Sequence, residues 1–240
     1  MARVPAALSV DFEFFQHAPA YRNAAGTADE PAIGLDGVEF LLDAFADASG
    51  DAAGEDTAGG SEDAAAGTFF TVSDIADDHA GVLRRIVDEG HELASHTHTH
   101  RHLTDLSPAE RREELATSRG RLADAADAEV VGFRAPSFDV PDDHFRALAD
   151  LGYEYDSSVV PCRKIPGWYG GEYDTWRPSP ASAVDPTAPD GLTEVPVAVM
   201  PGLRLPLTGT WIRFFGVRYT LLGMRLLARR AIPPVLYVHP

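Results

Sequence analysis

The sequence predicts a single α/β domain built as a distorted (β/α) barrel of about seven parallel strands. Short apolar, β-prone runs alternate with helical patterns along most of the chain, and ionisable side chains follow several of those runs. A length of 240 residues suits one domain of this size. A doubly wound open sheet is the alternative fold, but no Gly-x-Gly-x-x-Gly motif follows the first predicted strand.

The predicted strands are short runs rich in β-branched, aromatic and small apolar residues. They are Ala7–Phe12, Thr68–Val72, His91–Ser95, Glu129–Phe133, Tyr153–Tyr155, Thr193–Val199 and Pro234–Val238. Their alternation with helical segments is typical of a parallel sheet that has its helices on the outside.

Helices are predicted where apolar residues repeat at the spacing of one helical face. The repeat covers Val38–Phe45 and Val82–Val87, and Gly90 is expected to end the second of these helices. The clearest helix start is Ser107, followed by Pro108 and by the capping-box residue Glu110. Further helices are predicted at Asp143–Leu151 and Val217–Arg230.

The chain is strongly acidic, with 37 Asp and Glu against 20 Lys and Arg and a formal net charge of -17. A broad nucleic-acid-binding face is excluded, because phosphate contacts need clustered basic residues. Lys164 is the only lysine, and we interpret the acidic surface as that of a protein from a salt-rich cytoplasm; an ordinary acidic protein is the alternative. Cys162 is the only cysteine, so no intrachain disulfide can form.

Two segments bear on domain organisation and location. Ser49–Gly67 consists almost entirely of small and acidic residues, which predicts a flexible acidic insertion. No run of about 18 uncharged apolar residues occurs, so no membrane span is expected. The apolar run Val4–Val10 leads straight into Asp11 without a cleavage site, so we predict a buried strand and a cytoplasmic protein.

Ionisable side chains gather where the predicted strands end. They are Asp11 and Glu13 after the first strand, His96 and His100 after the third, then Arg134, Asp156 and His239 after later ones. The C-terminal strand ends of an α/β barrel form one face, and that face holds the active site. The sequence therefore predicts that these residues meet at one rim.

His96 and His100 are candidate metal ligands. The two residues are four apart, so they share one face if the segment is a helical turn. In an extended segment His98 and His102 would lie on that side as well. We expect His98 and His102 not to bind the metal. Two histidines and one carboxylate leave an open position for water, a set that suits zinc or a similar divalent ion.

The two carboxylates at the end of the first strand could have different catalytic roles. One of Asp11 and Glu13 could bind metal while the other acts as general base, although both could also be solvated acids. A buried Arg134 would need a carboxylate partner, for which Asp11 is the candidate; Arg134 could instead be a surface loop residue.

Four short motifs occur in order: Ser9–Glu13 (Ser-Val-Asp-Phe-Glu), His96–His100 (His-Thr-His-Thr-His), Arg134–Pro136 (Arg-Ala-Pro) and Leu236–His239 (Leu-Tyr-Val-His). In these motifs the whole chain resembles the polysaccharide deacetylases of the NodB-homology group, carbohydrate esterase family four. It is most similar to the branch that accompanies exopolysaccharide gene clusters. Many relatives have adjacent acids in the first motif, whereas Phe12 separates them here.

The resemblance implies a role for each motif residue. The ligands of one divalent ion, expected to be zinc, would be Glu13, His96 and His100. Asp11 would deprotonate the attacking water, Arg134 would orient Asp11, and His239 would protonate the leaving amine. Relatives continue past the position of His239, which is followed here only by Pro240.

Aromatic residues of the segment after the fifth predicted strand are candidate sugar-stacking groups. With Asp156, the expected substrate-binding residues are Trp168, Tyr169 and Trp176, and a core-packing role for the aromatics is equally compatible with the sequence.

We expect a cytoplasmic, metal-dependent hydrolase that removes N-acetyl groups from an amino sugar of a polysaccharide or glycan precursor. The alternatives are an amidase acting on a non-sugar C–N bond and an inactive sugar-binding protein. The sequence leaves the exact substrate, the metal and the oligomeric state open.

Overall fold

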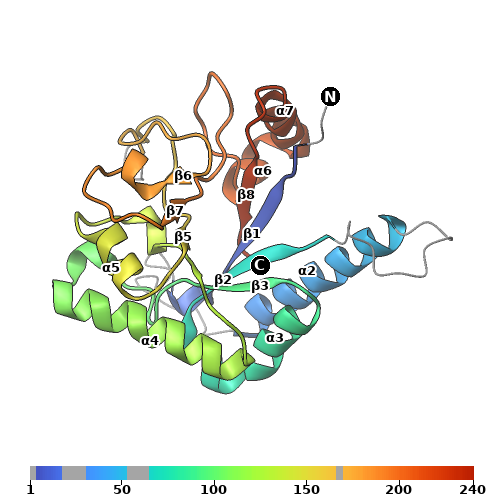
Figure 1. Ribbon diagram of the computed structural model, residues 1–240. Coiled ribbons are helices and arrows are strands. Elements are labelled where there is room, and N and C mark those ends of the chain that lie inside the picture. Colours follow the sequence, from blue (N-terminus) through green and yellow to red (C-terminus); the bar gives the residue numbers. More distant parts are fainter. Residues whose placement is uncertain (1–3, 18–30, 53–64, 166–169) are drawn as a thin grey trace.

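The computed structural model describes residues 4–17, 31–52, 65–165 and 170–240 as one eight-stranded sheet curled into a partial barrel (Figure 1). The strand order is β6-β7-β5-β4-β3-β2-β1-β8. Seven of these strands pair in parallel, and only β6 lies antiparallel to its neighbour β7. The predicted distorted barrel of about seven parallel strands is confirmed.

The strands occupy the predicted places but are shorter on the C-terminal side of the chain. Their bounds are β1 (Ala7–Phe12), β2 (Gly67–Thr71), β3 (Glu92–Ser95), β4 (Gly132–Phe133), β5 (Tyr155–Asp156), β6 (Ser179–Pro180), β7 (Thr193–Glu194) and β8 (Val235–Val238). The sequence did not predict β6, because its two residues, one of them proline, form no apolar run.

The predicted strand Thr193–Val199 continues as an irregular segment that bridges the open side of the sheet. Beyond β7, the Val197 amide donates to the Val159 carbonyl at 2.9 Å. The Ala198 amide donates to the Val235 carbonyl of β8, also at 2.9 Å. This segment therefore connects the β5 side of the sheet to its far edge, and the barrel is distorted here rather than open.

Helices cover the outside of the sheet (Figure 1). They are α2 (Pro31–Ala52), α3 (Ala76–Asp88), α4 (Pro108–Ala126), α5 (His144–Asp150), α6 (Gly209–Phe215) and α7 (Val217–Ala228). The sequence did not predict α6. None of the described helices is long and apolar enough to cross a membrane.

The expected helix ends are present. Ser107 and Glu110 form a complete capping box at the start of α4, and Gly90, just after α3, has a φ of 85°. The predicted flexible insertion Ser49–Gly67 needs correction at both ends, because α2 continues through Ala52 and Gly67 already belongs to β2. Residues 53–64 lie outside the described part of the chain.

The main core lies between the sheet and helices α2 to α5. Buried side chains of the strands, such as Phe12, Phe69 and Phe133, pack with Leu83 and Leu122 of the helices. This packing leaves the C-terminal ends of β1, β3, β4 and β8 as neighbouring parts of one rim, since only β2 separates β1 from β3.

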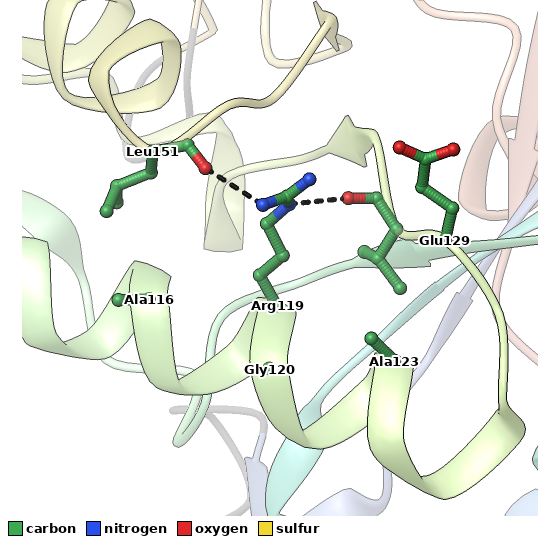
Figure 2. A pocket seen from close by; sticks show the side chains of 7 residues that line it. Ala116, Arg119, Gly120, Ala123, Glu129 and Leu151 are labelled. Atoms are coloured by element: carbon green, nitrogen blue, oxygen red, sulfur yellow. Dashed lines mark hydrogen bonds between the residues drawn. The ribbon is translucent and has the colours of Figure 1, made fainter.

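A separate cavity of about 330 Å³ lies against α4, and none of its lining residues belongs to that rim. Figure 2 shows the residues that line it. The Arg119 guanidinium spans it, donating to the carbonyls of Val130 at 2.8 Å and Leu151 at 3.1 Å. Arg119 therefore ties α4 to the segment before β4 and to the end of α5, which is a structural role.

Replacing Arg119 with methionine should lower the free energy of unfolding by about 1–3 kcal/mol, because two inward carbonyls lose a charged donor. Urea unfolding followed by circular dichroism measures the change. The control is Arg112→Met on the same helix, where an exposed pair with Asp150 at 3.6 Å should contribute less than about 1 kcal/mol. Equal losses in the two variants would refute the structural role of Arg119.

Candidate active site

Six residues from four strand ends meet at the C-terminal rim of the sheet. Asp11 and Glu13 come from the end of β1, and the others follow β3, β4 and β8: His96, His100, Arg134 and His239. Parallel strands end at the same edge, so residues as far apart in sequence as Asp11 and Arg134 come into direct contact.

Glu13, His96 and His100 form a cluster suited to a metal ion, with ligand atoms that all lie within 4.8 Å of one another. Glu13 Oε2 lies 2.6 Å from His100 Nε2, and the two imidazole rings have centroids 5.0 Å apart. Two imidazoles and one carboxylate are the donors that zinc and related divalent ions bind. The residues present therefore fit such an ion.

The segment that carries both histidines is neither the helical turn nor the strand considered from the sequence. Thr97 and His100 have positive φ values of 69° and 57°, so the backbone folds back sharply between them. Glu114 of α4 stabilises this loop by accepting hydrogen bonds from the Thr99 amide at 2.5 Å and the Thr99 hydroxyl at 2.8 Å. Ser118 Oγ donates to the Thr97 carbonyl at 2.9 Å.

The supporting roles of Glu114 and Ser118 could not be predicted from the sequence. Both are buried on the face of α4 that packs against the loop. Their spacing of four residues indicates a shared helical face, but nothing in the sequence says that this face contacts the histidine loop.

His98 and His102 lie outside the metal-suited cluster, as expected. His98 Nδ1 lies 2.9 Å from the hydroxyl of Ser73, and His102 Nε2 lies 3.1 Å from the hydroxyl of Ser137. His98 is half-buried rather than exposed, because it packs against the segment after β2.

His96 is held in the form that coordinates a metal. Its Nδ1 lies 2.8 Å from the Arg134 carbonyl oxygen, which accepts a hydrogen bond only if Nδ1 carries the proton. Nε2 then presents a lone pair toward the cluster. Burial lowers the pKa of His96 to about 4, so the ring is neutral at neutral pH.

Glu13 contacts histidines on both sides. Burial alone would raise the pKa of Glu13, but hydrogen bonds with His100 and His239 hold that pKa well below its ordinary value. His239 Nε2 lies 3.1 Å from Glu13 Oε1. Burial opposes protonation of His239, but the hydrogen bond to Glu13 and the nearby charge of Asp11 raise its pKa, which favours the protonated ring.

Arg134 is fully buried and binds Asp11, as its sequence context indicated. Its Nη1 donates to Asp11 Oδ1 at 2.7 Å, while Nε and Nη2 donate to the carbonyl and hydroxyl of Ser157 at 3.0 and 2.8 Å. The guanidinium carbon lies 4.1 Å from the centroid of the Phe70 ring. Asp11 Oδ2 is left facing His96 Nε2 at 3.8 Å, so this carboxylate borders the metal-suited cluster.

Asp156 lies in the protein interior and not at an exposed surface. It is fully buried, with Oδ2 3.1 Å from His144 Nε2 and Oδ1 accepting from Ser158 at 2.6 Å. Ser158 in turn accepts a hydrogen bond from the Ala135 amide at 2.8 Å. Asp156 therefore supports the loop that holds Arg134, and its expected contact with substrate stays a prediction.

A second buried acid, Glu194, lies beside Asp156. Burial and the Asp156 carboxylate raise the pKa of Glu194 well above its ordinary value. Burial alone would also raise the pKa of Asp156, but His144 and the neighbouring Glu194 and Ser158 lower it. One proton therefore stays on Glu194 while Asp156 carries the charge.

The predicted sugar-stacking role of the three aromatic residues stays a prediction. Trp168 and Tyr169 lie outside the described residues. Trp176 is half-buried between two apolar clusters, and its Nε1 donates to Asp174 at 2.9 Å. The geometry of Trp176 favours the packing role over sugar stacking.

A cavity of about 700 Å³ opens beside the cluster and is large enough for a sugar unit. Its lining includes Glu13 and His239 of the site together with Gly209, Thr210 and Arg213 of α6. A ligand in this cavity would therefore lie against Glu13 of the metal-suited cluster and against His239, which contacts Glu13.

The raised pKa of Glu194 predicts a specific pH effect on stability. The folded state holds the proton on Glu194 more tightly than the unfolded state does. The protonated carboxyl therefore contributes fully to the free energy of unfolding at low pH, and this contribution is lost as pH rises above the ordinary Glu pKa of 4.5. Glutamine does not titrate, so Glu194→Gln should not show this loss. Above pH 4.5 the free energy of unfolding of the variant should therefore rise relative to that of wild type by up to about 1.4 kcal/mol per pH unit.

Urea unfolding between pH 5 and 8 measures this difference. The control is Glu154→Gln, which removes an exposed carboxylate in the segment before β5 and should leave the pH dependence of wild type unchanged. Parallel pH profiles for wild type and Glu194→Gln would contradict the raised pKa of Glu194.

Two family models match parts of this chain. Residues 61–155 match the family model described as polysaccharide deacetylase, and residues 157–240 match one described as a domain of unknown function (DUF3473). The boundary between the two matches falls at β5, inside the single sheet.

Curated relatives match over part of their length. The chain is 36% identical over 89 residues to a chitooligosaccharide deacetylase of Sinorhizobium fredii, covering 35% of this chain and 40% of that protein. It is 38% identical over 58 residues to a chitooligosaccharide deacetylase of Bradyrhizobium sp., covering 24% and 26%. The chain thus spans less than half the length of these relatives.

The fold is shared along the whole chain. A crystal structure from Mycobacterium smegmatis, described as a polysaccharide deacetylase, superposes with a TM-score of 0.65 at 23% identity, covering 100% of this chain and 82% of that one. The polysaccharide deacetylase model thus covers residues 61–155, and the superposition shows that the fold is shared over the rest of the chain as well.

Proposed function

We propose that this protein is a metal-dependent deacetylase that hydrolyses the N-acetyl group of an amino sugar in a polysaccharide or glycan precursor. The observation that carries the proposal is the meeting, at one rim, of a metal-suited cluster with Asp11 on one side and His239 on the other. An inactive sugar-binding protein would have no need for this arrangement of ionisable groups.

The metal ligands in this proposal are Glu13, His96 and His100, and the ion is expected to be zinc. When bound, a divalent ion of this kind lowers the pKa of water and polarises a carbonyl oxygen. The protein contributes a neutral His96 and an ionised Glu13, which are the protonation states that bind metal.

Asp11 and His239 take the two proton-transfer roles. Asp11, fixed by Arg134 at 2.7 Å, accepts the proton of the water that attacks the acetyl carbonyl. His239 donates a proton to the amine nitrogen as the C–N bond breaks, releasing acetate and a free amino sugar. The raised pKa of His239 keeps it in the acid form that this step requires.

The wider setting of this activity is also part of the proposal. The acidic composition supports a salt-rich cytoplasm, and the resemblance of the first motif, Ser9–Glu13, to the branch that accompanies exopolysaccharide gene clusters supports a role in exopolysaccharide assembly.

Acetate release from N-acetylglucosamine oligomers, measured with added zinc in molar KCl, tests the function. We expect a bell-shaped dependence on pH, with the rate falling on the alkaline side above pH 6.5 as His239 loses its proton. Asp11→Asn should lower kcat at least 100-fold, because Asn cannot accept the proton. His239→Ala should lower kcat and abolish the alkaline limb.

His102→Ala is the matched control for His239→Ala, because it removes a half-buried imidazole outside the cluster and should retain activity. No acetate release from the sugar, together with ammonia or amine release from non-sugar amides, would favour the amidase alternative. A wild-type rate that rises monotonically with pH and survives His239→Ala would overturn the acid assignment.

A further inference from the structure

The charge of this chain is segregated along its sequence. All 37 acidic residues lie at or before Glu194, whereas residues 195–240 carry six arginines and no Asp or Glu. Five of the six belong to α6, α7 and the turn that follows α7: Arg213, Arg218, Arg225, Arg229 and Arg230. A protein with a net charge of -17 thus has one distinctly basic region.

The same region exposes large apolar side chains. Phe214 and Phe215 at the end of α6 are 77% and 51% exposed, and Val217 at the start of α7 is 62% exposed. Leu221 and Leu222 continue this surface along α7. Most of the exposed large apolar side chains among the described residues therefore lie within nine consecutive positions, which we call the 214–222 surface.

Arginines and apolar groups alternate on this surface. Arg218, Leu222, Arg225 and Arg229 follow one another at helical spacing on the exposed face of α7, whose opposite face is buried through Thr220 and other residues. Within the described part of the chain, none of the five arginines forms an ion pair with a carboxylate. Their charge is therefore available to an external anion.

Aromatic rings extend the surface inward. The Trp211 and Phe215 rings stack with centroids 5.7 Å apart, and Phe215 meets Tyr219 at 5.0 Å. Aromatic and aliphatic groups beside arginines are typical of protein surfaces that lie in the interface of a lipid bilayer.

We propose that the 214–222 surface, with its surrounding arginines, docks on an anionic lipid bilayer. The apolar side chains would enter the headgroup region while the arginines pair with lipid phosphates. Charge complementarity selects this occupant: the rest of the protein is acidic and is repelled by anionic lipid, so only this face can approach it. A second copy is disfavoured because two basic surfaces of this kind would repel each other.

The 214–222 surface lies beside the cavity of the candidate active site. Arg213 and Ile212 of α6 line the cavity of about 700 Å³ that Glu13 and His239 also line. Docking through α6 would bring the mouth of this cavity close to the lipid headgroups. If the proposed function holds, the enzyme would act on acetylated glycans presented at a membrane surface.

Sedimentation of the full chain with vesicles tests the docking without any measurement of activity. We expect binding to phosphatidylglycerol vesicles, little binding to phosphatidylcholine vesicles, and weaker binding as KCl increases. The double variant Arg218→Glu/Arg225→Glu should weaken binding at least tenfold. The matched control, Arg112→Glu/Arg146→Glu on α4 and α5, changes the net charge equally and should bind like wild type.

A second variant separates the apolar contribution. Phe214→Ser/Phe215→Ser should weaken binding at least tenfold while circular dichroism shows an unchanged fold, because both side chains are exposed. Equal binding by all variants, or no sedimentation of wild type with phosphatidylglycerol at low KCl, would overturn the proposal. Self-association of wild type that the Phe214→Ser/Phe215→Ser variant abolishes, without vesicle binding, would assign the surface to a second copy instead.

Discussion

A buried guanidinium at the end of β4 is the constraint on which the rest of this site depends. Arg134 has no access to solvent, so its charge needs both a carboxylate and further acceptors inside the protein. Asp11 supplies the carboxylate and Ser157 the other acceptors. The pairing orients Asp11 at the rim, and the Arg134 carbonyl at the same time orients His96.

The support extends outward through ordinary hydrogen bonds. Asp156 accepts a hydrogen bond from Ser158 and Glu194 accepts one from the Val159 amide, and this loop holds Arg134 through Ser157. Glu114 of α4 holds the histidine loop from the other side. The reactive residues lie on strand ends and loops, but each is fixed by a group on an adjacent element, which is what precise placement of a site requires.

The parallel sheet and the rim residues were predictable from the sequence, because a buried parallel strand leaves an apolar run with a polar residue at its end. Ala7–Phe12 followed by Glu13 is the clearest example. The capping box of Ser107 and Glu110 joins residues only three apart, so it was equally predictable from the sequence. The neighbours of these elements in space, such as Arg134 beside Asp11, followed from the rule that parallel strands end at one edge.

Other features depend on contacts that leave no local pattern. The short strands β4 and β7 and the irregular segment after β7 follow from closure of the barrel, not from propensity. The positive φ values of Thr97 and His100 arise because Glu114 and Ser118 of α4 fold that loop back. Asp156 was expected at the substrate because its strand end faces the rim, whereas His144 and Glu194 enclose it.

The central claim is that Glu13, His96 and His100 hold a divalent ion in a loop supported by Glu114. The most direct measurement is zinc affinity and stoichiometry by isothermal titration calorimetry, in molar KCl, for wild type and variants. We predict about one ion per chain for wild type and for the exposed control Glu113→Ala, affinity about 10–100-fold weaker for Glu114→Ala, and none for His96→Ala. Failure of wild type to bind zinc or cobalt, or equal affinities for the Glu113 and Glu114 variants, would contradict it.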